Sequence, residues 1–280
     1  MVEVVVRSTK CQVFFHFFAL GVDIQTKLAY NCLEPAQAGP HYHKKDKQKE
    51  KHMQYKIIGE PMPVVECTLA AGESMVTERG SMTWMTPNMQ MTTNAGGKGL
   101  GKMLGRALMG ESIFQNIYTA QGGPGMIAFG ASFTGSIRTY QIEPGKSIIV
   151  QKCGFLASEQ GVQLSMHLNK KLGAGLLGGE GFVMQKLSGQ GIAFVEIDGF
   201  AVEYELAPGQ SLLVNPGNIA VLDETVNMEM QSLKGVKNVL FGGEDWFQTK
   251  LTGPGKVVLQ TMTIAGLAGA ISPYMMKGNA

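Results

Sequence analysis

Two pairs of carboxylates in this 280-residue sequence are spaced for acid–base chemistry. Glu196 and Asp198 form one pair, and Glu203 and Glu205 form the other. Because side chains two residues apart on a β-strand point to the same face, each pair could place two carboxylates side by side. The polar face of a half-exposed strand shows the same spacing. We therefore predict no glycosidase-like or other acid–base role for either pair.

Histidine and cysteine offer little for metal binding or nucleophilic catalysis. Only His167 follows the first 52 residues, whereas cupin-type metal sites use several histidines with a carboxylate. A Ser-His-Asp or Cys-His arrangement also needs a histidine near its nucleophile. The four cysteines show neither a CxxC pair nor a metal-type spacing: Cys11, Cys32, Cys67 and Cys153. We predict no metal site and no catalytic set, with Cys67 and Cys153 as reduced, small, buried apolar side chains.

Residues 173–178 (GAGLLG) match the GxGxxG pattern of dinucleotide-binding loops, and Asp198 follows twenty residues later. Such a site needs a helix that begins on the loop, so that its N-terminal amides face the pyrophosphate. Residues 182–187 instead have the pattern of a strand. We predict no dinucleotide site and no other cofactor.

A basic amphipathic stretch lies within the long glycine-rich segment 96–110. Its cations recur every four residues and its apolar residues fill the other side of a helical projection. Such a stretch could contact an anionic membrane, a protein partner or phosphate, or it could pack on the domain with its cations solvated. The candidate interaction residues are Lys98, Lys102, Arg106, Leu100, Met103 and Leu104.

Composition indicates a globular, β-rich protein. The chain is 44% hydrophobic and 16% charged, so it can bury a core without disulfides or metal. Its 37 glycines lack a collagen period and indicate many turns between short strands. The first 52 residues hold eight of the 24 basic and five of the 22 acidic residues, which leaves 16 basic and 17 acidic residues. That near-neutral remainder argues against a broad nucleic-acid surface.

The first 52 residues differ in composition from the rest. They end in a Lys- and His-rich run at 41–52 and contain an apolar run at 13–22 that is too short to span a bilayer. Three interpretations stay open: a mispredicted start with Met53 as the true initiator, a disordered or interaction tail, or an export signal. We divide the chain into this extension and a domain spanning 53–280.

Three internal repeats organise the domain. A turn glycine recurs at Gly72, Gly145 and Gly209, at offsets of 73 and 64 residues. After each turn glycine, an alternating apolar strand pattern and a glycine-turn-strand block follow in the same order. A glycine-rich connection lies within each unit. The units span about 64–135, 136–201 and 202–265. They predict an all-β, sandwich- or barrel-like fold with a pseudo-threefold arrangement and short helical or glycine-rich loops.

Residues 81–92 (SMTWMTPNMQMT), the glycine-rich loop leading to 111–116 (ESIFQN) and the Gly-Pro-Gly turns carry a family resemblance. From about 53 to 273 the sequence resembles a family of unknown function related to mitochondrial-biogenesis (altered inheritance of mitochondria) proteins. The fold of that family is compared with the tryptophan RNA-binding attenuator protein. The resemblance implies a homo-oligomeric β-sandwich with a role in assembly or membrane organisation, and it supplies no catalytic residue.

We therefore expect a cytoplasmic, non-enzymatic β-sandwich protein that acts as a homo-oligomeric scaffold or assembly factor. Its glycine-rich loops would contact membranes or protein partners. One alternative is an attenuator-type RNA- or nucleic-acid-binding regulator, because equivalent loops also carry lysines: Lys170, Lys171, Lys234 and Lys237. A further alternative is the binding of a small ligand at a pocket between units.

Overall fold

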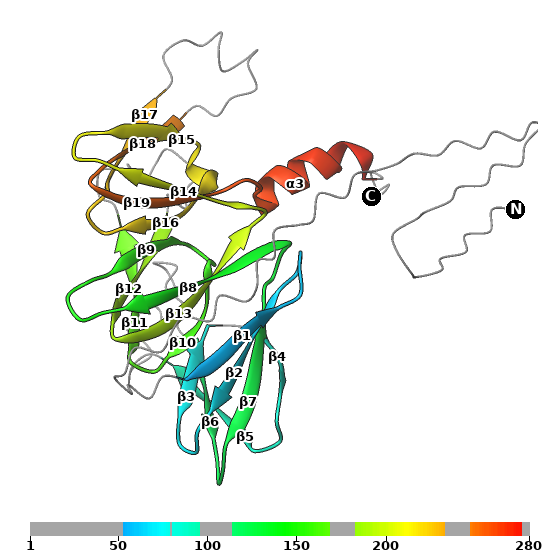
Figure 1. Ribbon diagram of the computed structural model, residues 1–280. Coiled ribbons are helices and arrows are strands. Elements are labelled where there is room, and N and C mark those ends of the chain that lie inside the picture. The colour runs from blue at the N-terminus through cyan, green and yellow to red at the C-terminus, as the bar shows by residue number, and fades with distance from the viewer. Residues whose placement is uncertain (1–52, 79, 96–113, 169–182, 233–246, 276–280) are drawn as a thin grey trace, which may run out of the picture. The chain divides into compact units, whose positions relative to one another are not determined.

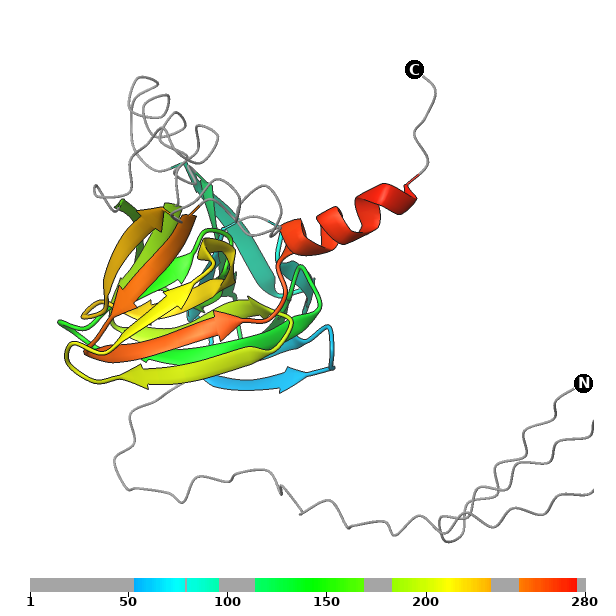
Figure 2. The same ribbon diagram turned by 90° about the horizontal axis from the view of Figure 1, so that it is seen from above.

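The computed structural model describes residues 53–78, 80–95, 114–168, 183–232 and 247–275. The described chain is almost entirely β, which confirms the predicted fold class, and its strands form twisted antiparallel sheets (Figures 1 and 2). One α-helix is described, α3 (Ile264–Ile271), with two short 3-10 turns, η1 (Pro216–Asn218) and η2 (Ser272–Tyr274). No described helix is long and apolar enough to cross a membrane.

Nineteen strands are described. They are β1 (Gln54–Ile58), β2 (Val64–Leu69), β3 (Ser74–Thr77), β4 (Met82–Met85), β5 (Met89–Ala95), β6 (Phe114–Ala120), β7 (Gly125–Gly130), β8 (Gly135–Ile142), β9 (Ile148–Gln151), β10 (Phe155–Glu159), β11 (Val162–Leu168), β12 (Val183–Gly189), β13 (Gly191–Asp198), β14 (Ala201–Leu206), β15 (Ser211–Val214), β16 (Ile219–Asp223), β17 (Asn227–Ser232), β18 (Phe247–Thr252) and β19 (Gly255–Gln260).

After β1, three consecutive groups of six strands share one pairing scheme. Group 1 is β2–β7, group 2 is β8–β13 and group 3 is β14–β19. In each group the first and third strands pair with the sixth, and the second and fourth strands pair with the fifth. The extra strand β1 pairs with the outer edge of β2.

The turn between the first two strands of each group has the geometry that its sequence predicts. Gly72, Gly145 and Gly209 have φ angles of 85°, 79° and 79°. In each turn the following N–H donates to the carbonyl three residues earlier at 3.0 Å. A positive φ at this position strongly favours glycine, which explains why the residue recurs.

The third strand of each group also carries the same irregularity. A register shift occurs between Met82 and Trp84, between Phe155 and Ala157, and between Ile219 and Val221. Two residues after each shift, a side-chain oxygen accepts a backbone N–H from the sixth strand. These bonds join Thr86 to Met126 at 3.0 Å, Glu159 to Ile192 at 2.7 Å and Asp223 to Lys256 at 2.8 Å. Positions in different groups can therefore be matched residue by residue.

Two strand pairs join the groups along the chain. β3 pairs with β10, which connects groups 1 and 2 in one six-stranded sheet. β9 pairs with β16, which connects groups 2 and 3 in the same way. The corresponding strands β4 and β15 are not paired with each other, and each is the outer strand of its sheet among the described strands. The pseudo-threefold arrangement in space stays a prediction.

The apolar core consists of three clusters of buried residues. The first two combine residues of neighbouring groups: Phe129 and Phe194 share the first, and Val195 and Val258 share the second. β1 adds to this packing, because the ring of Tyr55 lies edge-on to Phe194 with centroids 5.0 Å apart. The joints between groups are thus part of the hydrophobic core that stabilises the fold.

Candidate functional site

The predicted carboxylate pairs have different surroundings. Glu203 and Glu205 lie on exposed positions of β14, as expected for a solvated strand face. Glu196 and Asp198 are buried, which corrects the expectation that they lie on a half-exposed face. Every residue of β13 is buried, because the strand lies between β8 and β10 and is covered on both faces.

Glu196 is held by Ser132. The Ser132 backbone N–H donates to one carboxylate oxygen at 2.6 Å, and its hydroxyl bonds to the other at 3.0 Å. Burial raises the pKa of Glu196, and the hydrogen bonds from Ser132 partly oppose that rise. Burial also raises the pKa of Asp198. A backbone hydrogen bond from Ile264 partly opposes that rise, so each of the two buried carboxylates has a hydrogen-bond partner within the fold.

The two cysteines of the domain also differ from each other. Cys67 is buried, as predicted, and burial raises its pKa to about 12. Cys153 is exposed, which corrects the prediction that it is a buried apolar side chain. It lies in the turn before β10 with a φ of 71°, in the left-handed region that favours glycine. The matching position in group 1 is Gly80.

His167 is half-buried on β11, and burial together with the nearby Lys186 cation lowers its pKa. Among the described residues, no group of three or more His, Cys, Asp or Glu side chains is placed to hold a metal ion. The glycine-rich connections, with the candidate residues Lys98, Lys102, Arg106, Leu100, Met103 and Leu104, lie outside the described residues. So does the GxGxxG segment.

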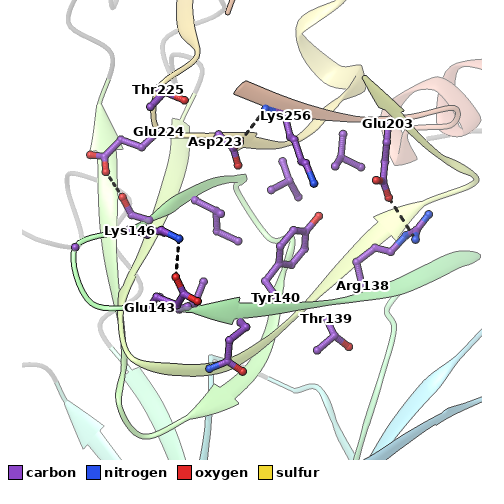
Figure 3. A pocket seen from close by; sticks show the side chains of 17 residues that line it. Arg138, Thr139, Tyr140, Glu143, Lys146, Glu203, Asp223, Glu224, Thr225 and Lys256 are labelled. Carbon is purple, nitrogen blue, oxygen red and sulfur yellow. Dashed lines mark hydrogen bonds and ion pairs between the residues drawn. The ribbon is translucent and has the colours of Figure 1, made fainter. Parts of the chain in front are cut away.

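A pocket of about 960 Å³ lies where group 2 meets group 3. One wall is β8 and the turn that follows it, and the other consists of β14, β16 and β19 (Figure 3). Tyr140 points from β8 into this pocket, and apolar residues such as Val221 and Val258 line it. Burial, and then the Glu203 carboxylate, raise the pKa of Tyr140 to about 12, so the hydroxyl stays protonated near neutral pH.

Most charged side chains around the pocket lie in pairs, whereas the Asp223 carboxylate accepts, among the described residues, only the backbone N–H of Lys256, at 2.8 Å. Arg138 contacts Glu203 at 3.4 Å, and Lys146 contacts Glu143 at 2.6 Å (Figure 3). Glu224 accepts hydrogen bonds from Ser147 and Lys186, and these bonds lower its pKa. With Lys186 included, four cations and four anions of the described chain surround the pocket, so the pocket suits a neutral occupant better than a strongly charged one.

The sequence could have indicated this pocket through the repeats. Arg138 and Tyr140 match Val65 and Cys67 of group 1, which are fully buried in β2, the strand that pairs with β1. A large polar residue at each of two positions that are apolar in another repeat is a signal of a changed environment. The glycine-rich loops carry the more conspicuous sequence pattern, and these two strand positions differ visibly only when the repeats are aligned.

The edge strands β4 and β15 form a second candidate surface. Trp84 and Met85 on β4 are 42% and 36% exposed, and Leu213 on β15 is 56% exposed. Their matches in the paired strands are buried. Unpaired edge strands with exposed apolar side chains are templates for pairing with another strand.

A family model for mitochondrial biogenesis protein AIM24 matches residues 55–262, most of the chain and nearly all of the strands. The chain belongs to the AIM24 family. This AIM24-family chain is 25% identical over 245 residues to the uncharacterized protein M6_Spy0233 of Streptococcus pyogenes serotype M6, covering 84% of this chain and 96% of that protein.

The crystal structure of protein SPYM3_0169 from Streptococcus pyogenes shares the fold of the AIM24-family chain, with a TM-score of 0.66 and 22% identity. The match covers 80% of this chain and all of that one. It shows the fold alone, and the likeness of the family to the attenuator protein stays a prediction.

Proposed function

We propose that this AIM24-family protein is a non-enzymatic, homo-oligomeric scaffold or assembly factor, whose copies join head to tail through β4 of one copy and β15 of the next. The observation that carries the proposal is that two joints of this kind exist within the chain, while the third pair of edges is apolar and unpaired among the described strands. The repeated pairing supplies the register for the contact between copies.

The register identifies the residues that would meet. Within the chain, Ser158 lies opposite Val76, and Leu222 lies opposite Ile149, with all four side chains buried. The matching positions in the free edges are Met85 and Leu213. Pairing between copies would place these two residues directly opposite each other and remove both apolar side chains from water.

A second contact follows from the same equivalence. Tyr140 and Val221 line one pocket between groups, and their matches Cys67 and Ala157 share a core cluster. The corresponding residues at the free ends are Tyr204, which is 45% exposed, and Trp84. Head-to-tail pairing brings Tyr204 of one copy over Trp84 of the next, and buried aromatic residues often dominate the energy of such interfaces.

The contact joins two different surfaces, so each added copy presents a new free edge. A heterologous interface of this kind builds a ring if the rotation closes and a filament if it does not. Either product gives a repetitive β-scaffold of the kind expected of an assembly protein. This supports a structural role without requiring a catalytic centre.

Sedimentation equilibrium of the full chain tests the proposal. We expect a mass that rises with concentration above the 30.1 kDa of one chain. Met85→Lys and Leu213→Lys should each weaken association by at least about tenfold, because a charge would be buried at the joint. Met62→Lys is the matched control, since Met62 is an exposed methionine outside both edges. A wild-type chain of 30.1 kDa at every concentration would overturn the proposal.

The glycine-rich loops supply the second part of the proposed role, contact with a membrane or a protein partner. The basic spacing of Lys98, Lys102 and Arg106 supports it. Replacing these three residues by alanine should abolish recruitment to anionic vesicles and leave neutral vesicles unaffected. Salt-dependent retention of pooled RNA that these changes remove would instead favour the alternative of a nucleic-acid-binding regulator.

A further inference from the structure

The outer edge of β8 is the part of group 2 that corresponds to a covered edge in group 1. In group 1 the outer edge of β2 is paired with β1 from Val64 to Thr68. β8 pairs with β13 on one side and is the outer strand of its sheet among the described strands. The pocket with Tyr140 lies beside this edge.

Main-chain groups of β8 face outward at alternate residues. The Gly135 N–H donates to the Pro61 carbonyl at 2.7 Å, away from β13, whereas the Thr134 carbonyl accepts from Gly199, the residue after β13, at 2.8 Å. Because N–H and C=O groups alternate in direction along a strand of an antiparallel pair, Thr139 and Gln141 face the same side as Gly135. Thr139 and Gln141 both line the pocket.

β1 shows what occupies the matching place in group 1. Tyr55 lies opposite Cys67 and packs on Phe194, while the adjacent Lys56 pairs with Glu66 at 2.6 Å. At the group 2 edge, Tyr140 takes the place of Cys67. Val258 takes the place of Phe194, and no described strand covers it from outside β8.

One polar group of the pocket also lacks a partner. The Nε of Arg138 is buried and has no hydrogen-bond acceptor among the described residues. An unpaired buried donor costs free energy that an incoming carbonyl oxygen would recover. Since Glu203 already balances the charge of Arg138, the missing partner of its Nε is a neutral acceptor.

We propose that the β8 edge binds an extended, uncharged segment of a partner protein, which adds to β8 as an antiparallel strand in the way that β1 adds to β2. An aromatic or large apolar side chain of that segment lies in the pocket beside Tyr140 and over Val258. Its main chain pairs with Thr139 and Gln141. Strand addition takes affinity from the main-chain hydrogen bonds and specificity from the pocket.

This binding site is independent of the head-to-tail joints. It uses β8 of group 2, whereas the joints use β4 and β15. A small molecule could fill 960 Å³ as well, but it would leave the outward main-chain groups of Thr139 and Gln141 unpaired. An added strand would instead pair with the main chain of β8 and also fill the pocket with one of its side chains.

A synthetic peptide with the sequence of residues 53–59 and the change Lys56→Gln, acetylated and amidated at its ends, is an uncharged probe with the strand pattern of β1. We expect it to bind the full chain and to slow amide hydrogen exchange in the segment 137–142. Peptides N-methylated at the amides that face β8 should bind about tenfold more weakly for each hydrogen bond lost. Peptides N-methylated at the alternate, outward amides are the matched controls and should bind like the parent.

Two protein variants test whether the peptide binds at the pocket beside β8. Val258→Trp fills the pocket and should abolish binding, since the new ring takes the space of the peptide side chain. Because Val258 is buried, the larger ring should also lower the stability of the fold. Tyr204→Ala, on the corresponding strand of group 3, should bind the peptide normally. Circular dichroism of both variants reports whether the fold is retained.

Four results would overturn the proposal. One is no binding at peptide concentrations up to about 1 mM. A second is equal binding of both N-methylated series, and a third is protection of β2 instead of β8, which would mean exchange with β1. The fourth is equal binding of N-acetyl-tyrosinamide with the same protection, which would indicate a small-molecule pocket.

Discussion

Leu222 of β16 lies directly opposite Ile149 of β9, and both side chains are buried at the joint between groups 2 and 3. Met85 and Leu213 occupy the same two positions in β4 and β15, where both are exposed. The chain thus carries two completed joints and the two halves of a third. We propose that copies of the chain associate through those halves by the same pairing that joins the groups within one chain.

The strand β1 should stabilise the joint between groups 1 and 2 through the Tyr55 ring. Tyr55→Ala removes the contact with Phe194, and we expect a loss of about 1–2 kcal/mol in the free energy of unfolding because the ring is partly exposed. Tyr204→Ala is the control at a similarly exposed tyrosine. It should leave chain stability nearly unchanged under monomeric conditions, and chemical denaturation of both variants compares them. Equal losses would show that Tyr55 has no special role.

Replacing Cys153 with glycine should stabilise the fold. Its φ of 71° costs a non-glycine residue about 1 kcal/mol, so Cys153→Gly should raise the free energy of unfolding by roughly that amount. Gly80, at the matching turn position with a φ of 74°, provides the reverse test. Its Cβ position has open space, so Gly80→Ala should lower stability through backbone strain alone. A destabilised Cys153→Gly variant would contradict this account of the turn.

Glu196 should make stability fall as pH rises. Burial raises its pKa above the ordinary 4.5, so the folded chain binds this proton more tightly than the unfolded chain does. The stabilisation is complete below pH 4.5 and is lost as the pH rises through the folded pKa. In Glu196→Gln this part of the pH dependence should disappear, while the contribution of Asp198, which has the same sign, remains.

The free energy of unfolding in urea, measured for the wild type and Glu196→Gln from pH 4.5 upward, checks the prediction. Ser132→Ala is a useful companion, because the loss of its hydroxyl hydrogen bond removes one of the interactions that favour the charged carboxylate. That variant should show a steeper decline with pH. Parallel curves for the wild type and Glu196→Gln would mean that Glu196 does not titrate differently on folding.

The all-β class and the repeated turns could be predicted from sequence because they depend on local chemistry. Gly72, Gly145 and Gly209 each occupy a position that favours a positive φ. Glycine therefore recurs at the same place in each repeat and is visible in the sequence. Burial on β13 was predicted wrongly, since Glu196 and Asp198 look like a solvated alternation. Whether both faces of a strand are covered depends on its distant neighbours, and a single-strand pattern does not contain that information.

The candidate surfaces show the same limit. Trp84 and Leu213 are typical strand residues, and only the pairing order of the sheets shows that their strands lie at unpaired edges. Tyr140 likewise is recognised as a pocket residue only because no described strand pairs with β8 in the way that β1 pairs with β2. The repeat offsets were sufficient to compare these positions, but the sequence did not show which edges are covered.

The most direct measurement of the central claim is the native mass of a mixture of Met85→Lys and Leu213→Lys chains. Each variant alone lacks one half of the joint and should sediment as a single 30.1 kDa chain. Mixed together, the intact β15 of the first and the intact β4 of the second should form one joint. The account predicts a complex of two chains. No further chain should add, because joining the remaining edges would place one lysine opposite another. A mixture that stays monomeric, or wild-type association that neither substitution weakens, would contradict it.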